Sequence, residues 1–496
     1  MKEYLIGIDV GTSGTKSVLF DTDGNAIASA TAEYPMAQPE NGWAEQNPED
    51  WWEAAKITLT EITAEAKDGR IVGLGLSGQM HSLVLLDKDD RVIRPAILWC
   101  DQRTGKECAE IECIIGRERL IEITANPALT GFSASKLMWV KKHEPENYRR
   151  IAHILLAKDY IRFRLTGEYA TEVSDASGMQ LFNVAKRAWS QEVCDKLGVK
   201  SEWLAKVYES PDVTGYVSEE AARLTGLPKG IPVAGGGGDN ASAAIGTGVY
   251  ASGKAFTTIG TSGVVFAPTD TPVIDPKGRI HTFCAAVPGT WHVMGVTQAA
   301  GLSLNWFRKN IAPDLSYREI DEVCEKLPIG AEKLLYLPYL MGERTPILDA
   351  NARGVFFGLS AMHTREHMAR AVMEGISYSL YSCVELLREN GVNVADMALC
   401  GGGGKSPFWQ RMLCDLYGVP IKTMKSDEGA ALGAAILGGC AAGVYASVAD
   451  GCEKAVRVNA TICPNVETHG EYMKYYEQYR DLYPALRERF SNLQQL

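Results

Sequence analysis

The feature that most constrains this sequence is a tetrapeptide that occurs twice, about half a chain apart. Gly-Thr-Ser-Gly occupies residues 11–14 and again residues 260–263, 249 residues apart in a chain of 496. Each copy lies between two strand-like segments, which are YLIGIDV and KSVLFD for the first copy and KAFTTI and VVFAPTD for the second. A motif repeated in the same strand–turn–strand context indicates two related lobes. Two facing hairpins of this kind would form a cleft, where ligands prefer to bind.

The two glycine-rich hairpins are candidate phosphate sites. In such a turn the backbone N–H groups can converge on a phosphate, the Thr and Ser hydroxyls add donors, and glycine permits close approach. A single copy would be interpreted as a tight hairpin turn, whereas two symmetric copies favour phosphate binding. Asp9 stands directly before the first hairpin. A carboxylate beside phosphates is a natural partner of Mg²⁺, and a turn-capping aspartate is the alternative.

A second candidate carboxylate follows a run of four glycines in IPVAGGGGDNASAAIGTG, where Asp239 and Asn240 precede a helix of small residues. Asp239 could simply cap that helix. Capping does not require four glycines, however, and an exposed backbone beside an acid indicates that a ligand docks there. A carboxylate in this position could accept the proton of a hydroxyl that attacks a phosphoryl group.

Another glycine run occurs in LCGGGGKSPFWQRMLCDLYG, residues 399–418, where a strand leads through glycines into a helix. Four consecutive glycines favour a flat adenine ring lying on exposed backbone over a helix that merely follows a flexible loop. Glu428 then opens a helix of Ala and Gly, which we expect to close the same floor.

Three familiar patterns are rejected. Gly73-x-Gly75-x-x-Gly78 matches a dinucleotide fingerprint, but the strand-like HSLVLLD follows it where a helix is required. His363-x-x-Glu366-His367 matches a zinc pattern at a helix start and has no apparent third ligand. Gly404-Lys405-Ser406 matches the end of a P-loop whose first glycine would be Leu399.

Composition excludes several classes of protein. The net charge is −11 and no segment gathers basic residues, which argues against nucleic acid or an anionic membrane as a partner. The 12 cysteines form no C-x-x-C pair, which disfavours zinc sites and disulfides and favours the cytoplasm. The N-terminal apolar run is too short for a signal peptide. Residues 429–449 are uncharged, but Ala and Gly dominate them, so we expect a buried helix and not a membrane span.

The remaining patterns predict an α/β chain. Asn47-Pro48 predicts a helix start, residues 71–78 a strand, and residues 105–230 a mainly helical region. The segment 467–493 predicts an amphipathic helix whose tyrosines pack on a lobe. We expect an N-terminal lobe over residues 1–246, a C-terminal lobe over 247–446 and a helical tail over 447–496.

These motifs together resemble the FGGY family of carbohydrate kinases, which share the two-lobed actin/hexokinase-like (ribonuclease H-like) ATPase fold. The resemblance covers nearly the whole chain. It rests on the following segments: IDVGTSGTKSVLFD, GGGGDNA, IGTSGV, LPYLMGERTP, LCGGGGKS and EGAALGAA. Within the family the chain is most similar to the xylulokinases, on LSGQMHSLVLLD, LWCDQR, LAKDYIRFRLTGE, SDASGM and GVFFGL.

The resemblance implies roles for individual residues. Asp239 would be the general base, Asp9 would lie by the metal and the phosphates, and Met80, His81 and Asn240 would contact the sugar. The nucleotide and its phosphates would be bound by the following residues: Gly11, Thr12, Ser13, Lys16, Gly260, Thr261, Gly301, Asn305, Gly402 and Ser406.

The function that the resemblance implies is transfer of a phosphoryl group from ATP, with Mg²⁺, to D-xylulose. The same transfer to another ketose or polyol, such as ribulose or glycerol, is the alternative. A non-metabolic ATPase of the same fold is a rival from another class, but it has no use for an acid facing a sugar hydroxyl. The expected partners are therefore a small ketose and ATP, without nucleic acid or membrane, in a chain that acts alone or as a homodimer.

Overall fold

The first of two central sheets is built from residues close to the N-terminus. The computed structural model describes residues 2–495. The sheet has seven strands: β1 (Lys2–Val10), β2 (Gly14–Asp21), β3 (Ala26–Glu33), β5 (Gly69–Gly78), β13 (Val213–Tyr216), β14 (Pro232–Ala234) and β15 (Gly237–Gly238). Their order is β13-β14-β5-β1-β2-β3, with β15 also paired to β5. Strand β1 runs antiparallel to β2 and parallel to β5, so the sheet is mixed.

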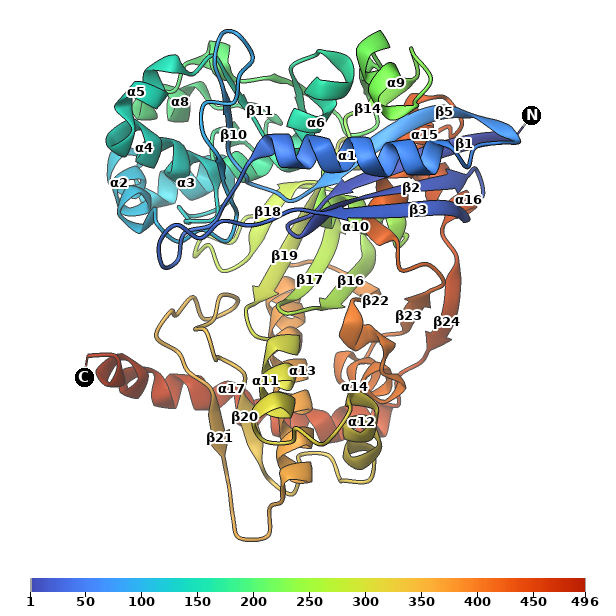
Figure 1. Ribbon diagram of the computed structural model, residues 1–496. Coiled ribbons are helices and arrows are strands. Elements are labelled where there is room, and N and C mark those ends of the chain that lie inside the picture. Colours follow the sequence, from blue (N-terminus) through green and yellow to red (C-terminus); the bar gives the residue numbers. More distant parts are fainter. Residues whose placement is uncertain (1, 496) are drawn as a thin grey trace.

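The second sheet repeats this arrangement in the other lobe (Figure 1). Its strands are β16 (Gly253–Ile259), β17 (Gly263–Thr269), β18 (His281–Cys284), β19 (Trp291–Thr297), β22 (Val394–Cys400), β23 (Ile421–Met424) and β24 (Val458–Ile462). Their order is β18-β19-β17-β16-β22-β23-β24. Strand β16 runs antiparallel to β17 and parallel to β22, as β1 does with β2 and β5. The predicted internal repeat is therefore a repeat of topology.

Short strand pairs and helices surround the sheets. The pairs are β4 (Glu45–Gln46) with β7 (Ala96–Ile97), β6 (Val84–Leu86) with β8 (His153–Leu155), β9 (Ala170–Glu172) with β12 (Lys206–Tyr208), β10 (Phe182–Asn183) with β11 (Ala188–Trp189), and β20 (Leu335–Leu337) with β21 (Val355–Phe357). The helices up to the second sheet are α1 (Pro48–Thr63), α2 (Gly105–Ile115), α3 (Arg117–Thr124), α4 (Ser133–His143), α5 (Pro145–Arg150), α6 (Ala157–Thr166), α7 (Val173–Ala176), α8 (Gln191–Leu197), α9 (Glu219–Thr225) and α10 (Asp239–Gly246). The later helices are α11 (Gly301–Asn310), α12 (Tyr317–Glu325), α13 (Arg365–Glu389), α14 (Pro407–Tyr417), α15 (Gly429–Ala441), α16 (Val448–Ala455) and α17 (Val466–Leu493). Short 3-10 turns occupy Ser177–Met179, Ser201–Trp203 and Gly402–Lys405.

Helix α1 begins where the sequence predicts. The Asn47 side chain accepts a hydrogen bond from the Glu49 N–H, and Pro48 occupies the first turn, where its missing N–H costs nothing. The helix buries Trp51 and Trp52 and lies across β2 and β3 (Figure 1). The helical region predicted over residues 105–230 is also confirmed by α2 to α9, which short strands interrupt.

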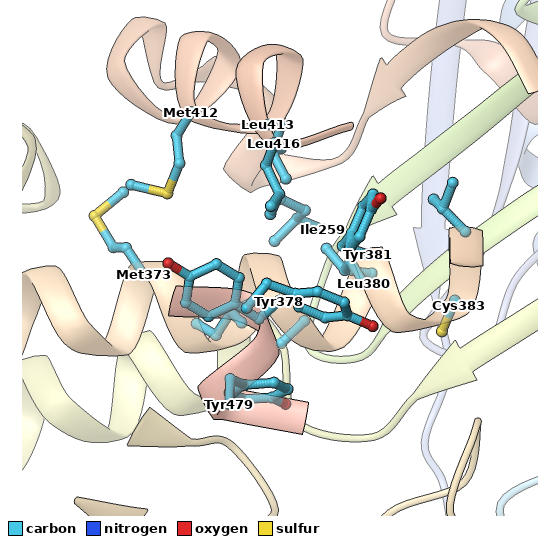
Figure 2. Close-up of a cluster of buried hydrophobic side chains, with 14 of the residues drawn as sticks. Ile259, Met373, Tyr378, Leu380, Tyr381, Cys383, Met412, Leu413, Leu416 and Tyr479 are labelled. Atoms are coloured by element: carbon cyan, nitrogen blue, oxygen red, sulfur yellow. The ribbon is translucent and has the colours of Figure 1, made fainter. Parts of the chain in front are cut away.

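The core of the second lobe lies between its sheet and helices α13, α14 and α17. Figure 2 shows Tyr378 of α13 beside Tyr479 of α17, with Met412 of α14 above them. The predicted tail helix is α17, and its tyrosines 472, 476, 479 and 483 are buried. Their packing on the second lobe confirms the interpretation of the tyrosine stripe as structural. The segment before α17 also contains α16 and β24, and β24 pairs with β23. The boundaries 1–246, 247–446 and 447–496 stay a prediction.

Helix α15 is buried, as the sequence predicts, against β1, β5 and α10 of the first lobe. Its first residues, Gly429 and Ala430, also line a cavity together with Gly401 and Gly404 of the glycine run. A Cβ on Gly7 would lie 1.8 Å from the Ala431 carbonyl oxygen, and one on Gly433 would lie 1.8 Å from the Ser242 carbonyl oxygen. Its small residues therefore allow backbones to approach closely. Within residues 2–495 no helix is both long and apolar enough to span a bilayer.

Candidate active site

A cavity of about 300 Å³ between the two lobes collects the four predicted sugar-binding residues. We call it the central cavity. Its wall from the first lobe includes Met80, His81, Asp239 and Asn240, with Trp99, Leu129, Gly131 and Phe132 beside them. Its wall from the second lobe is formed by Ser262, Val264, His281, Phe283, Met294, Val296 and Arg344. The structure thus brings together residues from both halves of the sequence.

Asp239 is held at the end of a strand of the first sheet. It is the first residue of α10 and follows β15, which pairs with the end of β5. The Ser174 hydroxyl accepts a hydrogen bond of 3.1 Å from the Gly238 N–H, and Arg162 donates one of 2.9 Å to the Gly235 carbonyl oxygen. These bonds fix the backbone on which the carboxylate stands.

The glycines before Asp239 have a different role from the predicted one. A Cβ on Gly236 would lie 2.0 Å from the Leu76 carbonyl oxygen, and its φ is +72°. A Cβ on Gly238 would lie 2.8 Å from Cγ of Met80. All four glycines are buried, so they permit close packing inside the protein and do not expose backbone to a ligand.

The Asp239 carboxylate has one satisfied oxygen and one free oxygen. Its Oδ1 accepts hydrogen bonds from the Asn240 N–H at 2.7 Å and from Asn240 Nδ2 at 3.0 Å. Its Oδ2 has no hydrogen-bond partner among residues 2–495. Burial raises the pKa of Asp239 to about 6, and the Asp9 carboxylate adds to the shift. A carboxylate with this pKa can accept a proton near neutral pH.

His81 stands in an unusual backbone conformation with a φ of 69°. Its carbonyl oxygen accepts hydrogen bonds from the Ser133 hydroxyl at 3.1 Å and from Lys136 Nζ at 2.8 Å. Its ring Nδ1 lies 2.9 Å from the Gly178 carbonyl oxygen. The ring is therefore both bonded to backbone and part of the cavity wall, and a strained backbone of this kind is typical of functional sites.

Asp9 is the penultimate residue of β1 and pairs with Lys16 of β2. Burial raises the pKa of Asp9, and the nearby Ser77 hydroxyl and the positive charge of Lys16 oppose that shift. Its Oδ1 is buried without a hydrogen-bond partner among the residues that the structure describes. A buried carboxylate oxygen without a partner is costly unless a cation or a donor reaches it. Lys16 itself lies 2.5 Å from Oε1 of Glu428 and so joins the first hairpin to the start of α15.

The first hairpin is fixed by neighbouring side chains. The Gly11 carbonyl oxygen accepts hydrogen bonds from Tyr34 and Gln79, and the Thr12 carbonyl oxygen accepts one from Gln46. The Trp99 indole donates to Thr12 Oγ1 at 2.9 Å. Within residues 2–495 the N–H groups of Thr12 and Ser13 have no partner, so they remain available to an anion.

The six candidate nucleotide residues from the second lobe share one cavity of about 700 Å³. We call it the nucleotide cavity. Gly260, Thr261, Gly301, Asn305, Gly402 and Ser406 all line it. The Gly301 N–H donates to the Gly260 carbonyl oxygen at 2.8 Å, which fixes the second hairpin to the start of α11. Gly402 has open space where a Cβ would stand, as expected of backbone on which a flat ring can lie.

The rejected motifs behave as the sequence analysis expects. Gly73, Gly75 and Gly78 lie in β5, and a turn and β6 follow instead of a helix. His367 belongs to the capping box of α13 with Thr364. Ser406 caps α14 by accepting a hydrogen bond from the Trp409 N–H. Within residues 2–495 no group of three His, Cys, Asp or Glu side chains could hold a metal ion.

The second lobe adds residues to these cavities that the sequence alone does not indicate. His281, Phe283, Met294 and Val296 lie on β18 and β19, and their alternation in the sequence indicates only a strand. Arg344 lies in the segment LPYLMGERTP, which carries the family resemblance but implies no role for the arginine. Tyr317, Arg318 and Asp321 of α12 line the nucleotide cavity in the same unforeseen way.

Comparisons with known proteins follow the same two halves. The model for the N-terminal domain of the FGGY family of carbohydrate kinases matches residues 4–246, and the model for its C-terminal domain matches residues 255–442. A xylulose kinase of Bacillus subtilis is 40% identical over 485 residues, which is 97% of each chain.

Solved structures are also similar over nearly the whole chain. The ligand-bound xylulose kinase of Lactobacillus acidophilus has a TM-score of 0.94 at 31% identity. The match covers 99% of this chain and 100% of the xylulose kinase chain. A gluconate kinase of the same organism has a TM-score of 0.95 at 30% identity with the same coverage. The two neighbours share the architecture and differ in the acceptor that their names state.

Proposed function

Since this chain belongs to the FGGY family of carbohydrate kinases, we propose that it transfers the γ-phosphoryl group of ATP to D-xylulose. The products would be ADP and D-xylulose 5-phosphate. Relatives named xylulose kinase, at 37% to 40% identity over nearly the full length, support this acceptor. The observation that carries the proposal is the free Oδ2 of Asp239 in a cavity that also holds Met80, His81 and Asn240.

In the proposed mechanism Asp239 accepts the proton of the attacking hydroxyl. The sugar oxygen forms a bond to the γ-phosphorus while the bond to the β–γ bridging oxygen breaks, and ADP leaves. Asn240 holds Oδ1 through two hydrogen bonds and so orients Oδ2 toward the acceptor. Met80 packs against carbon atoms of the sugar, and His81 contributes one hydrogen bond.

The two hairpins would hold the phosphates from opposite lobes. The free N–H groups of Thr12 and Ser13 would donate to the transferred group, with Gly11 and Lys16 beside them. Gly260 and Thr261 would contact the phosphates from the second lobe. The adenosine would occupy the nucleotide cavity, against Gly301, Asn305, Gly402 and Ser406. In this arrangement the phosphates would lie between the two hairpins, with Asp9 just before the first.

Asp9 fits a divalent cation. Its buried Oδ1 has no partner within residues 2–495, and the same residues offer no cluster of three protein ligands. Mg²⁺ suits this donor set, because it is usually bound by one or two carboxylates together with phosphates and water. When bound it would neutralise charge on the phosphates. We propose Asp9 as the residue that holds it.

The location of the reaction is part of the proposal. All 12 cysteines are free in the structure. Free thiols and consumption of ATP support the cytoplasm.

The test is release of ADP across a panel of acceptors. We expect D-xylulose to give the highest kcat/KM, above D-ribulose, glycerol and D-gluconate. D-gluconate belongs in the panel because of the similarity to a gluconate kinase. ATP hydrolysis that does not depend on any acceptor would support the non-metabolic ATPase instead, and a higher kcat/KM for glycerol would reject the ketose assignment.

A further inference from the structure

The central cavity contains a cation that the mechanism above does not use. Arg344 lines the cavity from the second lobe. Within residues 2–495 its guanidinium has no hydrogen-bond or ion-pair partner, and only its backbone N–H bonds the adjacent Glu343. Burial lowers the pKa of Arg344, the negative charge of Glu343 opposes that shift, and the arginine remains charged. A partly buried guanidinium without a partner is costly unless a ligand supplies acceptors.

The backbone that carries Arg344 is firmly attached to the second sheet. The Thr345 N–H donates to the Val296 carbonyl oxygen at 3.0 Å, and the Val296 N–H donates to Thr345 Oγ1 at 3.1 Å. The neighbouring Glu343 accepts hydrogen bonds from Thr297 Oγ1 at 2.6 Å and from the Gln298 N–H at 2.8 Å. These bonds connect the residues on both sides of Arg344 to the end of β19. The backbone that carries the unpaired guanidinium is therefore held in a fixed position.

Arg344 and His281 line the wall of the central cavity that the second lobe supplies, and His81 lines the wall from the first lobe. Burial lowers the pKa of His281, and the charge of Arg344 adds to that shift. Burial also lowers the pKa of His81, where the charge of Lys136 adds more than that of Arg344. Asp239 stands on the opposite wall, which the first lobe supplies. An acceptor whose attacking hydroxyl meets Asp239 would extend its other end toward Arg344.

Both histidines present a hydrogen-bond acceptor. Nδ1 of His81 lies 2.9 Å from the Gly178 carbonyl oxygen, which can only accept, so this nitrogen carries the proton. Nδ1 of His281 lies 2.9 Å from Oδ1 of Asn126, whose Nδ2 donates to two carbonyl oxygens. Burial lowers the pKa of His281 to about 3 and that of His81 well below its usual value. Both rings are therefore neutral, and each has a lone pair on Nε2.

This combination of groups fits one class of acceptor. The guanidinium fork can donate to a carbonyl oxygen, and the two Nε2 atoms can accept protons from hydroxyl groups. An α-hydroxyketone offers both kinds of group side by side. A polyol offers no carbonyl oxygen. A carboxylate would bind the guanidinium, but it would place its oxygens against two lone pairs that cannot donate.

We propose that Arg344, with His281, is the specificity-determining contact for the hydroxyketone end of the acceptor, opposite the hydroxyl that is phosphorylated. The proposal rests on the proposed kinase function and goes beyond it by naming what selects a ketose over a polyol and over a sugar acid. Because Asp239 and His81 belong to the first lobe and Arg344 and His281 to the second, the acceptor contacts both lobes.

The experiment compares three acceptors of equal length, which are D-xylulose, xylitol and D-xylonate. Loss of a hydrogen bond to a charged group costs between about tenfold and a hundredfold. In Arg344→Met we expect kcat/KM for D-xylulose to fall by that factor, while kcat/KM for xylitol and the affinity for ADP stay close to wild type. Arg344→Lys keeps the charge without the fork and should recover only part of the loss. Arg353→Met is the matched control, because Arg353 follows nine residues later and donates to the Ala350 and Ala352 carbonyl oxygens.

His281→Gln independently tests the contact between His281 and the hydroxyketone end of the sugar. Its amide offers two donors where the imidazole offers a lone pair, so we expect the ratio of D-xylonate to D-xylulose turnover to rise by about tenfold. An equal fall for D-xylulose and xylitol in Arg344→Met would overturn the proposal and indicate a contact to the phosphoryl group or a structural role. An unchanged Arg344→Met would overturn it as well.

The wild-type enzyme separates this inference from the proposed function. A wild type that phosphorylates xylitol as well as D-xylulose is still a kinase but has no hydroxyketone contact. If the wild type phosphorylates none of the three compounds, both the hydroxyketone contact and the proposed kinase function are rejected. Binding of ADP to every variant shows that the variant is folded.

Discussion

The two sheets place equivalent strands at the cleft, but different kinds of residue follow those strands in the two lobes. Strand β1 leads into the hairpin at residues 11–14, and β16 leads into the same tetrapeptide at residues 260–263. The parallel neighbours are β5, which leads to Met80 and His81, and β22, which leads to the glycines at 401–404. The same framework thus presents acceptor-binding residues in one lobe and bare backbone for a nucleotide in the other.

The clearest difference lies two residues before each hairpin. The first lobe has Asp9 there, and the second has Thr258. The hairpins also differ in their supports, since side chains hold the first and the start of α11 holds the second. A repeated turn therefore supplies anion-binding geometry in both lobes, while the charge that would hold a metal ion exists in one.

The largest effect is expected where the first lobe has a group with no counterpart in the second. Asp239→Asn preserves the hydrogen-bonding shape but removes the proton acceptor, so we expect kcat to fall on the order of a thousandfold. Sugar affinity should change far less. Steady-state kinetics and equilibrium binding of D-xylulose measure the two quantities. Near-normal turnover in this variant would show that Asp239 is not the base.

The second test makes the two hairpins alike. Asp9→Thr copies Thr258 into the first lobe and removes the proposed metal-holding carboxylate. We expect kcat to fall on the order of a hundredfold, with a higher Mg²⁺ concentration needed for half-maximal rate. Thr258→Ser is the matched control and should leave the Mg²⁺ dependence unchanged. If Asp9→Thr retained the wild-type Mg²⁺ dependence, the asymmetry would have no catalytic meaning.

The third test damages each lobe separately. A Cβ at Gly301 would lie 2.4 Å from the Gly260 carbonyl oxygen, so Gly301→Ala must displace the second hairpin. We expect it to weaken nucleotide affinity by about tenfold and to spare the sugar. His81→Ala should do the opposite, with a KM for D-xylulose raised about tenfold. Titration with ADP and kinetics with D-xylulose separate these effects. A raised KM for D-xylulose in Gly301→Ala, or a weakened nucleotide affinity in His81→Ala, would contradict the assignment of nucleotide to one lobe and sugar to the other.

The fourth test uses the raised pKa of Asp239, which burial causes and the charge of Asp9 increases. Because the raised pKa of Asp239 is about 6, the base becomes protonated as the pH falls below that value. We expect kcat/KM to decline about tenfold per pH unit on the acid side, with an apparent pKa near 6. A plateau of kcat/KM extending to pH 5 would mean that the pKa of the base is not raised.

The smallest effect is on stability. The pKa of Asp239 is raised in the folded state above its ordinary value of 3.8. The carboxyl therefore stabilises the fold only while it is protonated, and that contribution is lost as the pH rises through about 6. We expect Asp239→Asn to raise the free energy of unfolding by about 1 to 2 kcal/mol at pH 7.5. Urea titrations at pH 7.5 and pH 4 check the sign, because the difference should disappear at the lower pH.

Several elements could be predicted from the sequence because local patterns decide them. Residues close together in the sequence determine the two strand–turn–strand units. The same is true of the Asn47-Pro48 start of α1 and of the tyrosine stripe of α17. The glycine run before α14 is of the same kind, and Gly402 is open as expected. The resemblance of the motifs to one family added the remaining candidate residues.

What the tertiary structure decided are the contacts between distant segments. Helix α15 packs on β1 and β5, more than 350 residues away in the sequence, because glycines in all three elements let their backbones touch. The same applies to Gly236 and Gly238, whose missing side chains make room for Leu76 and Met80. Arg344 and His281 reach the central cavity only because β18 and β19 form the opposite wall. Sequence periodicity shows which face of a strand is buried, but only the packed lobes determine what that face meets.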